Sequence, residues 1–446
     1  MKRLLTIIIS ITAALTTTAR DYNIIDFGAV SDTTRLSTAA LQKAIDRCSN
    51  DGGGRVVVPA GMYTTGTLVL RSHVDLHLET GATLYGSTDI DDYRPLTTTY
   101  MSLRTWGPTV QLIYADGQTD VAISGRGTID GRGAAFPKLT WNDEGITRPH
   151  LLRFIQCSDV SISGVTLRNS GCWMQHYLAC DRVQINGIRV FNRNNYNNDA
   201  LDLDGCHDVI VSDMIADSDD DGITLKSTSP RLCENIVIRG CIVSSHCNAI
   251  KLGTETNGGF RNIIITDCVV KPSSDQSSQF FGDPSKRGTS AISLEITDGG
   301  TLENVHVSNI VAEGTESPIF IRLGNRARSY APDVAIDHVG NISGVHLSNI
   351  TINGAGRTGC SITGLPGHHV QDIWLSDITI HQQGGCGTIA MPTDEKEKDY
   401  PEATMWGPLP AKGFFVRHAR NVNFSNIVIT TAEPDQRPDF VCDDVE

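Results

Sequence analysis

The sequence lacks an excess of positive charge, long hydrophobic runs beyond its first residues, and closely spaced metal ligands. Its 37 Lys and Arg residues are outnumbered by 51 Asp and Glu residues, giving a formal charge of −14, which argues against nucleic acid as the main partner. No segment approaches the length of a membrane span. No His/Cys spacing typical of a metal site occurs, so the sequence implies neither a metal nor a cofactor. An anionic substrate must therefore be met by local cations.

The composition is that of a large globular chain with a leader. The 446 residues are 39% hydrophobic and 20% charged, enough to bury a large core. Within residues 1–19, Lys2 and Arg3 precede an apolar run that ends in small residues, as in a secretory signal cut near Ala19. We therefore expect an exported protein, periplasmic or extracellular, that is a monomer with a mature part of residues 20–446.

A short phrase recurs ten times along the chain: polar residues followed by Val or Ile, any residue, and a second apolar residue. Successive copies start 23 to 49 residues apart, at Asp120, Asp159, Arg182, Asp208, Asn235, Asn262, Asn304, Gly344, Asp372 and Asn421. Each unit is too short to fold alone, and the alternation predicts one buried face. We therefore predict an all-β fold, a single right-handed parallel β-helix with coils about 4.8 Å apart.

The ends of the chain and its cysteines refine this prediction. Residues 37–48 have apolar positions at helical spacing and predict a short helix that caps the N-terminal strand edges. After Ile429 the sequence is acidic, and we expect irregular structure. No linker interrupts the body, so residues 20–446 are expected to form one domain. We favour a column of buried thiols over disulfides, because a chain of this length can fold without disulfide cross-links. In addition, four cysteines recur at one place in the repeat: Cys157, Cys180, Cys206 and Cys233.

A second phrase, starting at Asp199, Asp221, Asn248, Ser290 and Ser317, sets a second register. Its alternate Leu and Ile residues are expected to stack inward, so the residues between them point outward. The expected outward ladders are Asp202, Thr224, Lys251, Ser293 and Phe320, and Asp204, Lys226, Gly253, Glu295 and Arg322. They form a mixed polar ledge along one face.

Asp199, Asp220 and Asp221 stand at the entrances of two neighbouring strands of this register, where like charges repel. Two chemistries use such a cluster on a β-helix: a Ca²⁺ site, and acid/base hydrolysis of a glycosidic bond. An inverting hydrolase protonates the leaving oxygen with one carboxyl group, while others activate water about 6.5–9.5 Å away. Crowding keeps one of the carboxyl groups protonated by raising its pKa. The alternative is that residues 219–221 form only a solvated turn without a catalytic or binding role.

At these residues the chain resembles glycoside hydrolase family 28, which includes polygalacturonases and rhamnogalacturonan hydrolases. Residues 24–30, IIDFGAV, are similar to the family's N-terminal region. The family's Asn-x-Asp motif matches Asn197 to Asp199, and its Asp-Asp motif matches Asp220-Asp221 before GITLKS. The resemblance implies an inverting enzyme acting on pectin, in which Asp220 is the general acid and Asp199 and Asp221 hold the water.

Two family motifs are altered. The Gly-His-Gly motif falls where Cys247 occupies the place of its His, and the Arg-Ile-Lys motif falls at Ser293-Leu294-Glu295. The resemblance implies that the latter motif binds a galacturonate carboxylate in the leaving-group subsite, where Glu295 would repel it. Rhamnogalacturonan hydrolases of the family also lack these cations. We therefore expect a neutral or deoxy leaving sugar, and cleavage of the galacturonosyl–rhamnose linkage.

Further substrate contacts are predicted from residue type and position. An aromatic and an imidazole group one coil before the Asp cluster suit a sugar face. A second His lies beside the altered motif. Three cations remain that could bind the carboxylate of a uronate on the other side of the cleaved bond. With the motif residues, the predicted set is Trp173, His176, Asn197, Lys226, His246, Lys251, Glu295 and Arg322. Residues 400–410 are expected to be a cleft wall or a rigid surface loop.

Three alternatives remain for a partner that is a pectic poly- or oligosaccharide. The first is an exo-acting α-galacturonosidase or polygalacturonase on pectin fragments, with a loop such as 271–288 closing one end of the groove. The second is a Ca²⁺-dependent pectate lyase, against which the lack of a clear catalytic Arg or Lys beside the Asp cluster counts. The third is a non-catalytic glycan-binding β-helix.

Overall fold

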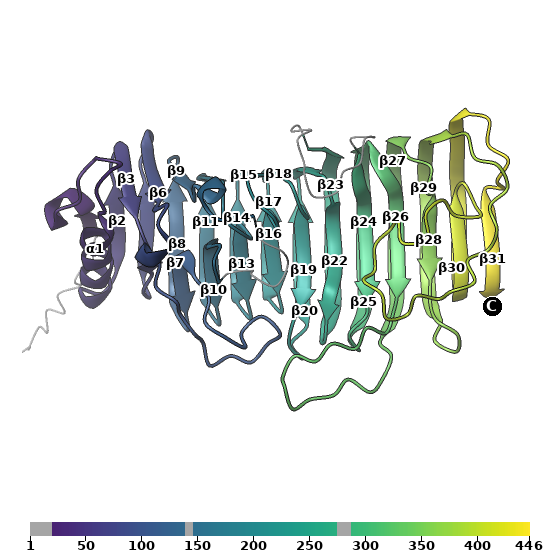
Figure 1. Ribbon diagram of the computed structural model, residues 1–446, viewed down its shortest axis with the longest axis horizontal. Coiled ribbons are helices and arrows are strands. Elements are labelled where there is room, and N and C mark those ends of the chain that lie inside the picture. The colour runs from purple at the N-terminus through teal and green to yellow at the C-terminus, as the bar shows by residue number, and fades with distance from the viewer. Residues whose placement is uncertain (1–19, 139–145, 274–286) are drawn as a thin grey trace, which may run out of the picture.

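The computed structural model describes residues 20–138, 146–273 and 287–446, which form a rod of strands lying side by side across its long axis (Figure 1). All pairings between its named strands are parallel, and they join the strands into one continuous sheet that winds around the rod. This confirms the predicted right-handed parallel β-helix. The predicted signal segment and most of loop 271–288 lie outside the described residues.

The ten repeated phrases stack on one another, each in its own strand of a first face. In consecutive coils the first apolar residue of the phrase pairs with its counterpart, as in Val160 with Val183 and Val183 with Val209. These side chains are fully buried, and each such burial contributes roughly 1.5–3 kcal/mol. The first face runs through β1 (Arg20–Asn23), β2 (Gly54–Val58), β5 (Val74–Leu78), β8 (Thr119–Gly125), β11 (Ser158–Ser163), β14 (Asp181–Asn186), β17 (His207–Ser212), β20 (Cys233–Arg239), β23 (Gly259–Pro272), β25 (Thr301–Glu313), β27 (Asn341–Ala355), β29 (Val370–Gly384) and β30 (Phe414–Glu433).

Two further faces complete each coil. The second face consists of β3 (Gly61–Thr65), β6 (Ala82–Gly86), β9 (Thr128–Asp130), β12 (Thr166–Arg168), β15 (Arg189–Asn192), β18 (Ile215–Ser218) and β21 (Ile242–Ser245). It then continues in the long strands of the first face, because β23 pairs with both β20 and β21. The third face, which carries the second repeated phrase, consists of β4 (Leu68–Val69), β7 (Gln111–Asp116), β10 (His150–Ile155), β13 (Gln175–Leu178), β16 (Leu201–Asp204), β19 (Ile223–Ser227), β22 (Asn248–Thr256), β24 (Gly288–Ile296), β26 (Thr315–Leu323), β28 (Cys360–Thr363) and β31 (Phe440–Val445).

The polar residue that opens each repeated phrase has a backbone role. In all ten copies this residue has a positive φ, between 51° and 68°, a conformation that Asn, Asp and Gly adopt most readily. The side chains also bond from coil to coil: Asn235 donates to Asp208 at 3.1 Å, and Asn262 donates to Asn235 at 3.1 Å. The corner of the coil therefore selects these residue types, and Val and Ile follow where the strand begins.

The predicted capping helix is α1 (Thr38–Asn50), at the N-terminal end of the rod (Figure 1). Its buried side chains follow helical spacing, at Ala40, Leu41, Ala44, Ile45 and Cys48. Gln42 fixes the helix to β4, because its amide both donates to and accepts from the backbone of Val69 at 2.9 and 2.8 Å. In the part of the chain that the structure describes there are also three short 3-10 helices: η1 (Ile24–Phe27), η2 (Ile90–Asp92) and η3 (Gly133–Ala135).

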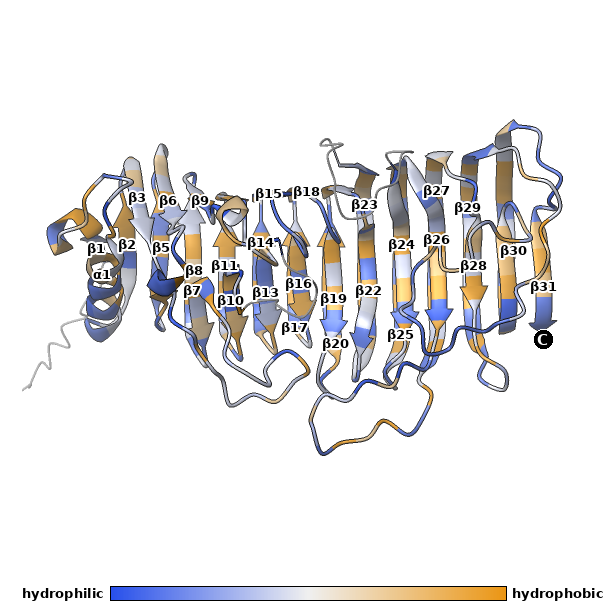
Figure 2. Cartoon of the chain, viewed as in Figure 1, coloured by the Kyte–Doolittle hydropathy of each residue, from blue (hydrophilic) through white to orange (hydrophobic). Residues whose placement is uncertain are grey.

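The cysteine column is confirmed as a stack of free, buried thiols. The thiols of Cys180, Cys206 and Cys233 each donate to a backbone carbonyl of the preceding coil, at 3.1–3.4 Å. Hydrophobic colour follows the strands over the length of the rod, and hydrophilic colour marks many strand ends (Figure 2). Within the described ranges, no helix has the length and apolar character needed to cross a membrane.

The expectation of an irregular C-terminus is wrong. Strand β30 continues to Glu433, and β31 then returns to pair in parallel with the start of β30. Phe440 stacks on Phe414 with ring centroids 6.0 Å apart. The acidic residues of β31 bind cations of β30, as in the 3.0 Å pair of Asp443 with Arg417. Charge compensation between β31 and β30 therefore permits a strand where the acidic sequence had predicted irregular structure.

Candidate active site

The third face presents the polar ledge in the register expected from the sequence. Asp202 pairs with Thr224, Thr224 with Lys251, and Lys251 with Ser293. The register shifts after Leu225, where Ser227 pairs with Thr256, so the expected pairing of Lys226 with Gly253 in the second ladder is wrong. The first ladder thus places one outward polar side chain on each successive coil.

The three predicted catalytic carboxyl groups line one cavity of about 550 Å³ on this ledge. Asp199 lies just before β16, and Asp220 and Asp221 lie just before β19. Asp221 accepts hydrogen bonds from the backbone and side-chain N–H groups of Asn248 at 3.1 and 3.0 Å. Asp219 does not line the cavity and pairs with His246 at 3.0 Å. The turn over residues 219–221 is therefore held by specific side-chain contacts and is not simply solvated.

The two adjacent carboxyl groups differ in proton affinity. Burial, reinforced by the charge of Asp221, raises the pKa of Asp220 to about 8. Burial also opposes ionisation of Asp221, but Lys251, with Nζ 2.9 Å from Oδ2, outweighs it and holds the pKa of Asp221 below its usual value. Near neutral pH the site therefore offers a protonated acid beside an ionised carboxylate, the pairing that glycoside hydrolysis needs.

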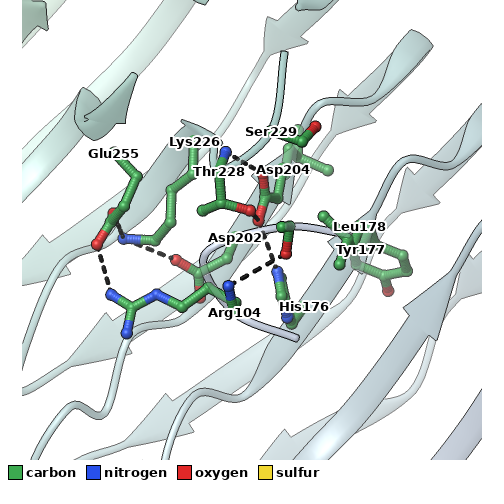
Figure 3. A network of polar contacts seen from close by, with 12 residues as sticks. Arg104, His176, Tyr177, Leu178, Asp202, Asp204, Lys226, Thr228, Ser229 and Glu255 are labelled. Carbon is green, nitrogen blue, oxygen red and sulfur yellow. Dashed lines mark hydrogen bonds and ion pairs between the residues drawn. The ribbon is translucent and has the colours of Figure 1, made fainter. Parts of the chain in front are cut away.

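Lys226 connects the floor of the cavity to its wall. Its ammonium lies 3.4 Å from Glu255, 3.5 Å from Asp202 and 3.9 Å from Asp199. Figure 3 shows Lys226 extended between Glu255 and Asp202, with the Arg104 guanidinium bound to the same Glu255 carboxylate. Burial, with the charge of Asp199, raises the pKa of Asp202. Lys226 is thus neutralised by the protein's own carboxylates.

The same network fixes the imidazole of His176, which stands on the outward ladder one coil before Asp202 (Figure 3). His176 Nε2 lies 3.1 Å from Asp204, which also accepts from the backbone and hydroxyl of Thr228 at 2.8 and 2.6 Å. Burial lowers the pKa of His176 to about 4 even though Asp204 opposes the change. The ring is therefore neutral under ordinary conditions and acts as a hydrogen-bonding group rather than a cation.

Distant loops complete the cavity. Tyr400, Glu402 and Met405 line it, so segment 400–410 is a cleft wall, one of the two alternatives expected. The Tyr400 hydroxyl accepts from Lys251 at 3.1 Å and from Thr254 at 3.0 Å.

Cations also reach the cavity from loops. Arg328, after β26, lies 3.1 Å from Glu255, and Arg326 lies 3.2 Å from Asp298. Arg104 and Lys396 also line the cavity. Sequence reasoning missed all four because they follow no repeat and match no motif. They are identified only by their closeness to the Asp cluster in the folded chain, because they lie far from it in the sequence.

The predicted substrate contacts divide into two groups. Trp173, Asn197 and Lys226 line the cavity with the carboxylates, and His176 lines a neighbouring cavity that shares Trp173. The other four, which the walls of these two cavities do not include, are His246, Lys251, Glu295 and Arg322.

These four are buried by contacts with the protein itself. Lys251 is bound to Asp221, and His246 to Asp219. Glu295 accepts from Ser293 at 2.6 Å, and burial raises its pKa to about 7. The Arg322 guanidinium donates to backbone carbonyls, including that of Gly364 at 3.1 Å, and lies over the Trp406 ring. Direct contact of these four groups with a sugar stays a prediction.

Asp220, Asp221 and Cys247 are close enough to form a metal-ligand group, since one atom of each lies within 4.8 Å of the others. Ca²⁺ prefers six to eight oxygen ligands, and the Cys247 thiol is not one. Burial and the nearby carboxylates raise the pKa of Cys247, so it stays protonated. Asp221 is already neutralised by Lys251. The donor set does not fit Ca²⁺.

Known proteins resemble this chain in sequence and in fold. The family described as Glycosyl hydrolases family 28 matches residues 48–396. A probable polygalacturonase of Vitis vinifera is 33% identical over 226 residues, which cover 48% of this chain and 46% of that protein. An exo-poly-alpha-D-galacturonosidase of Dickeya chrysanthemi is 34% identical over 167 residues, 36% of this chain and 27% of that protein.

Among solved structures, an exopolygalacturonase from Thermotoga maritima has a TM-score of 0.71 at 22% identity, over 92% of each chain. At this identity the structural likeness concerns the fold. The chain spans less than half the length of the two curated relatives.

Proposed function

We propose that this chain, which belongs to glycosyl hydrolase family 28, is an inverting hydrolase of α-linked galacturonosyl residues in pectin. The observation that carries the proposal is the pair of adjacent carboxyl groups with opposite proton affinities. Burial raises the pKa of Asp220, while Lys251 holds the pKa of Asp221 low. One cavity thus supplies both an acid and a carboxylate that attracts the proton of water.

The roles follow from this difference. Asp220 donates its proton to the glycosidic oxygen as the bond to the leaving sugar breaks. Asp199 and Asp221 hold a water molecule on the opposite face of the sugar and accept its proton, so the product has inverted configuration. Asp220 then takes up a proton from solvent, and the carboxylate that accepted the proton of water releases it to solvent. Asn197 is expected to contact the substrate beside Asp199, because it lines the same cavity.

For the leaving sugar we propose rhamnose, so that the cleaved bond is the galacturonosyl–rhamnose linkage of rhamnogalacturonan. Ser293 and Glu295 occupy the positions of the family's basic pair, and neither supplies a positive charge. Glu295 is completely buried with one oxygen unpaired. A neutral sugar above this position avoids bringing a second carboxylate toward it.

A second candidate is exo-acting hydrolysis of polygalacturonan, in which the leaving sugar is galacturonate. Two observations favour it. Arg326 and Arg328 line the cavity, and loop 93–110 crosses the third face. In this crossing Leu103 donates to the carbonyl of Thr228 at 2.8 Å, and the Trp106 indole donates to that of Tyr330 at 2.9 Å.

Export, domain extent and assembly belong to the same proposal. We expect residues 1–19 to be removed on export, leaving residues 20–446 as one monomeric catalytic domain. N-terminal sequencing of the secreted protein and light scattering on the mature protein test these points.

Product analysis tests the proposed activity. The enzyme is incubated with de-acetylated rhamnogalacturonan and with polygalacturonan, beside Asp220→Asn, and the products are identified by mass spectrometry. Saturated products from rhamnogalacturonan alone, absent with the variant, support the proposed linkage. Release of galacturonate from polygalacturonan supports the second candidate. Unsaturated products would indicate a lyase, and binding without cleavage, unaffected by Asp220→Asn, would indicate a glycan-binding protein.

A further inference from the structure

A second cavity, of about 410 Å³, lies beside the first toward the N-terminal end of the rod. Arg104 and Trp173 line both cavities, so the two share a wall. The wall of the second cavity also includes Trp106, His150, Arg153 and His176. The wall of the second cavity is therefore aromatic and cationic, and the described residues that line it include no carboxylate.

Arg153 belongs to the same outward ladder as the catalytic floor. It pairs with His176, which in turn pairs with Asp202. Two coils separate Arg153 from Asp202, roughly 10 Å at the usual strand spacing. The second cavity therefore continues the polar ledge, where a sugar chain lying along the third face would extend beyond the carboxylates.

Arg153 is a buried cation that no described carboxylate contacts directly, although the charge of Asp204 attracts it at longer range. Its side chain is 2% exposed, and its guanidinium donates to the Thr109 hydroxyl at 2.5 Å and to the backbone carbonyl of Arg104 at 2.7 Å. Nε has no hydrogen-bond partner, and within the described ranges Arg153 makes no ion pair. Burial lowers its pKa to about 10, so it remains charged at neutral pH. Because an unpaired buried charge is costly, this position suits an anion that arrives with the substrate.

Two of the three cations nominated from the sequence do not have this property. Lys226 is surrounded by Asp199, Asp202 and Glu255, and Lys251 is paired with Asp221. Their charges are already neutralised. The third, Arg322, is also buried with no ion pair among the described residues, but it donates to the backbone carbonyls of Gly364 and Glu395 and lines neither cavity. Arg153 is thus better suited to read a uronate than either lysine.

The neighbours of Arg153 suit the rest of a sugar ring. The Trp173 and His176 rings meet edge to face with centroids 5.0 Å apart. Nδ1 of His176 and Nδ1 of His150 both lack hydrogen-bond partners. Burial lowers the pKa of both imidazoles, so they are neutral. Apolar ring surfaces and neutral nitrogen atoms are the groups that pack against a sugar face and bond its hydroxyls.

We propose that this second cavity binds a uronosyl residue on the glycone side of the cleaved bond, with the sugar's carboxylate on Arg153. The inference rests on the proposed function for its direction: the altered basic motif on β24 marks the leaving-group side, and the second cavity lies on the opposite side of the carboxylates.

Kinetics with matched substrates test the proposal. Oligosaccharides from the pectic polymer that the enzyme cleaves, and the same oligosaccharides with their galacturonosyl carboxyl groups reduced, are given to the wild type, Arg153→Met, Arg153→Lys and the exposed control Arg126→Met. Since charge-assisted hydrogen bonds are at stake, Arg153→Met is expected to lower kcat/KM for the acidic substrate roughly 10- to 100-fold. It should leave the reduced substrate unaffected. Arg153→Lys should give an intermediate loss, and the control none.

A binding measurement separates this proposal from the proposed catalysis. Calorimetry measures methyl α-galactopyranosiduronate and methyl α-galactopyranoside with Asp220→Asn, with and without Arg153→Met. Preference for the uronate that disappears with Arg153→Met supports the site even if the enzyme cleaves neither pectic polymer. Equal losses for both sugars, or no loss, overturn it. Where Arg153→Met does not fold, Arg153→Lys and the sugar preference of Asp220→Asn alone decide, and the absence of a preference for the uronate overturns the proposal.

Discussion

Replacing Lys251 with Met tests how the site keeps one carboxylate ionised. Lys251 is completely buried, and its ammonium lies 2.9 Å from Asp221. Met retains most of the side-chain volume while removing the charge. Asp221 is then left as a buried carboxylate without its nearest counterion, although Lys226 still attracts it.

The size of the effect follows from this geometry. Two unit charges 2.9 Å apart attract by about 6 kcal/mol at an effective dielectric constant of 20, and burial of the charges offsets part of that attraction. Removing one partner of a buried pair costs about 3–5 kcal/mol. Since the folded state lowers the pKa of Asp221, this stabilisation is complete above the pKa of an unfolded Asp and is lost as pH falls through the folded value.

Urea unfolding of the wild type, Lys251→Met and the exposed control Lys43→Met measures this difference. We expect Lys251→Met to be about 3–5 kcal/mol less stable at pH 7, and the difference to shrink as the solution is acidified toward pH 3. The acidic limb of its kcat/KM profile should also move to higher pH, because the water-holding carboxylate ionises less readily. Equal stability at pH 7, together with an unchanged acidic limb, would refute the pairing of Lys251 with Asp221.

The remaining predictions concern proton release, backbone space and the thiols. Because burial raises the pKa of Asp220 to about 8, kcat/KM should fall as pH rises past that value, and a profile flat to pH 10 would contradict its role as the acid. Gly253→Ala should destabilise the fold by about 1–3 kcal/mol in urea unfolding, since at φ 132° a Cβ would lie 2.8 Å from Glu295; unchanged stability would show that the strand relaxes. The cysteines are free thiols, so dithiothreitol should leave the thermal unfolding midpoint unchanged, and a lower midpoint would reveal disulfides.

The fold was predictable because a single local pattern determines it. Each repeated phrase buries alternate residues, and only stacking on a neighbouring coil completes that burial. The ladder from Asp202 through Thr224 to Lys251 followed from the same alternation. The C-terminal strand was hidden because its acidic side chains find their cations on another strand, as Asp443 finds Arg417.

The candidate site was predictable only where it lies on the repeat. Asp199, Asp220 and Asp221 stand at strand entrances, so sequence alignment of coils brings them together. Burial and pairing were not visible in the sequence: Lys251 is outward in register yet covered by Tyr400 from a loop 149 residues away. Loop cations such as Arg326 and Arg328 follow no period, so only the folded chain shows that they reach the cavity.

The anomeric configuration of the first product tests the central claim most directly. Proton NMR spectra are recorded in the first minutes of hydrolysis of oligosaccharides from the pectic polymer that the enzyme cleaves, before mutarotation, with Asp220→Asn as control. Inverting hydrolysis by the acid Asp220 and the water-holding pair Asp199 and Asp221 predicts that the new reducing end appears first as the β-anomer, and that the control releases none. An α-anomer appearing first, or an unsaturated product, would contradict it.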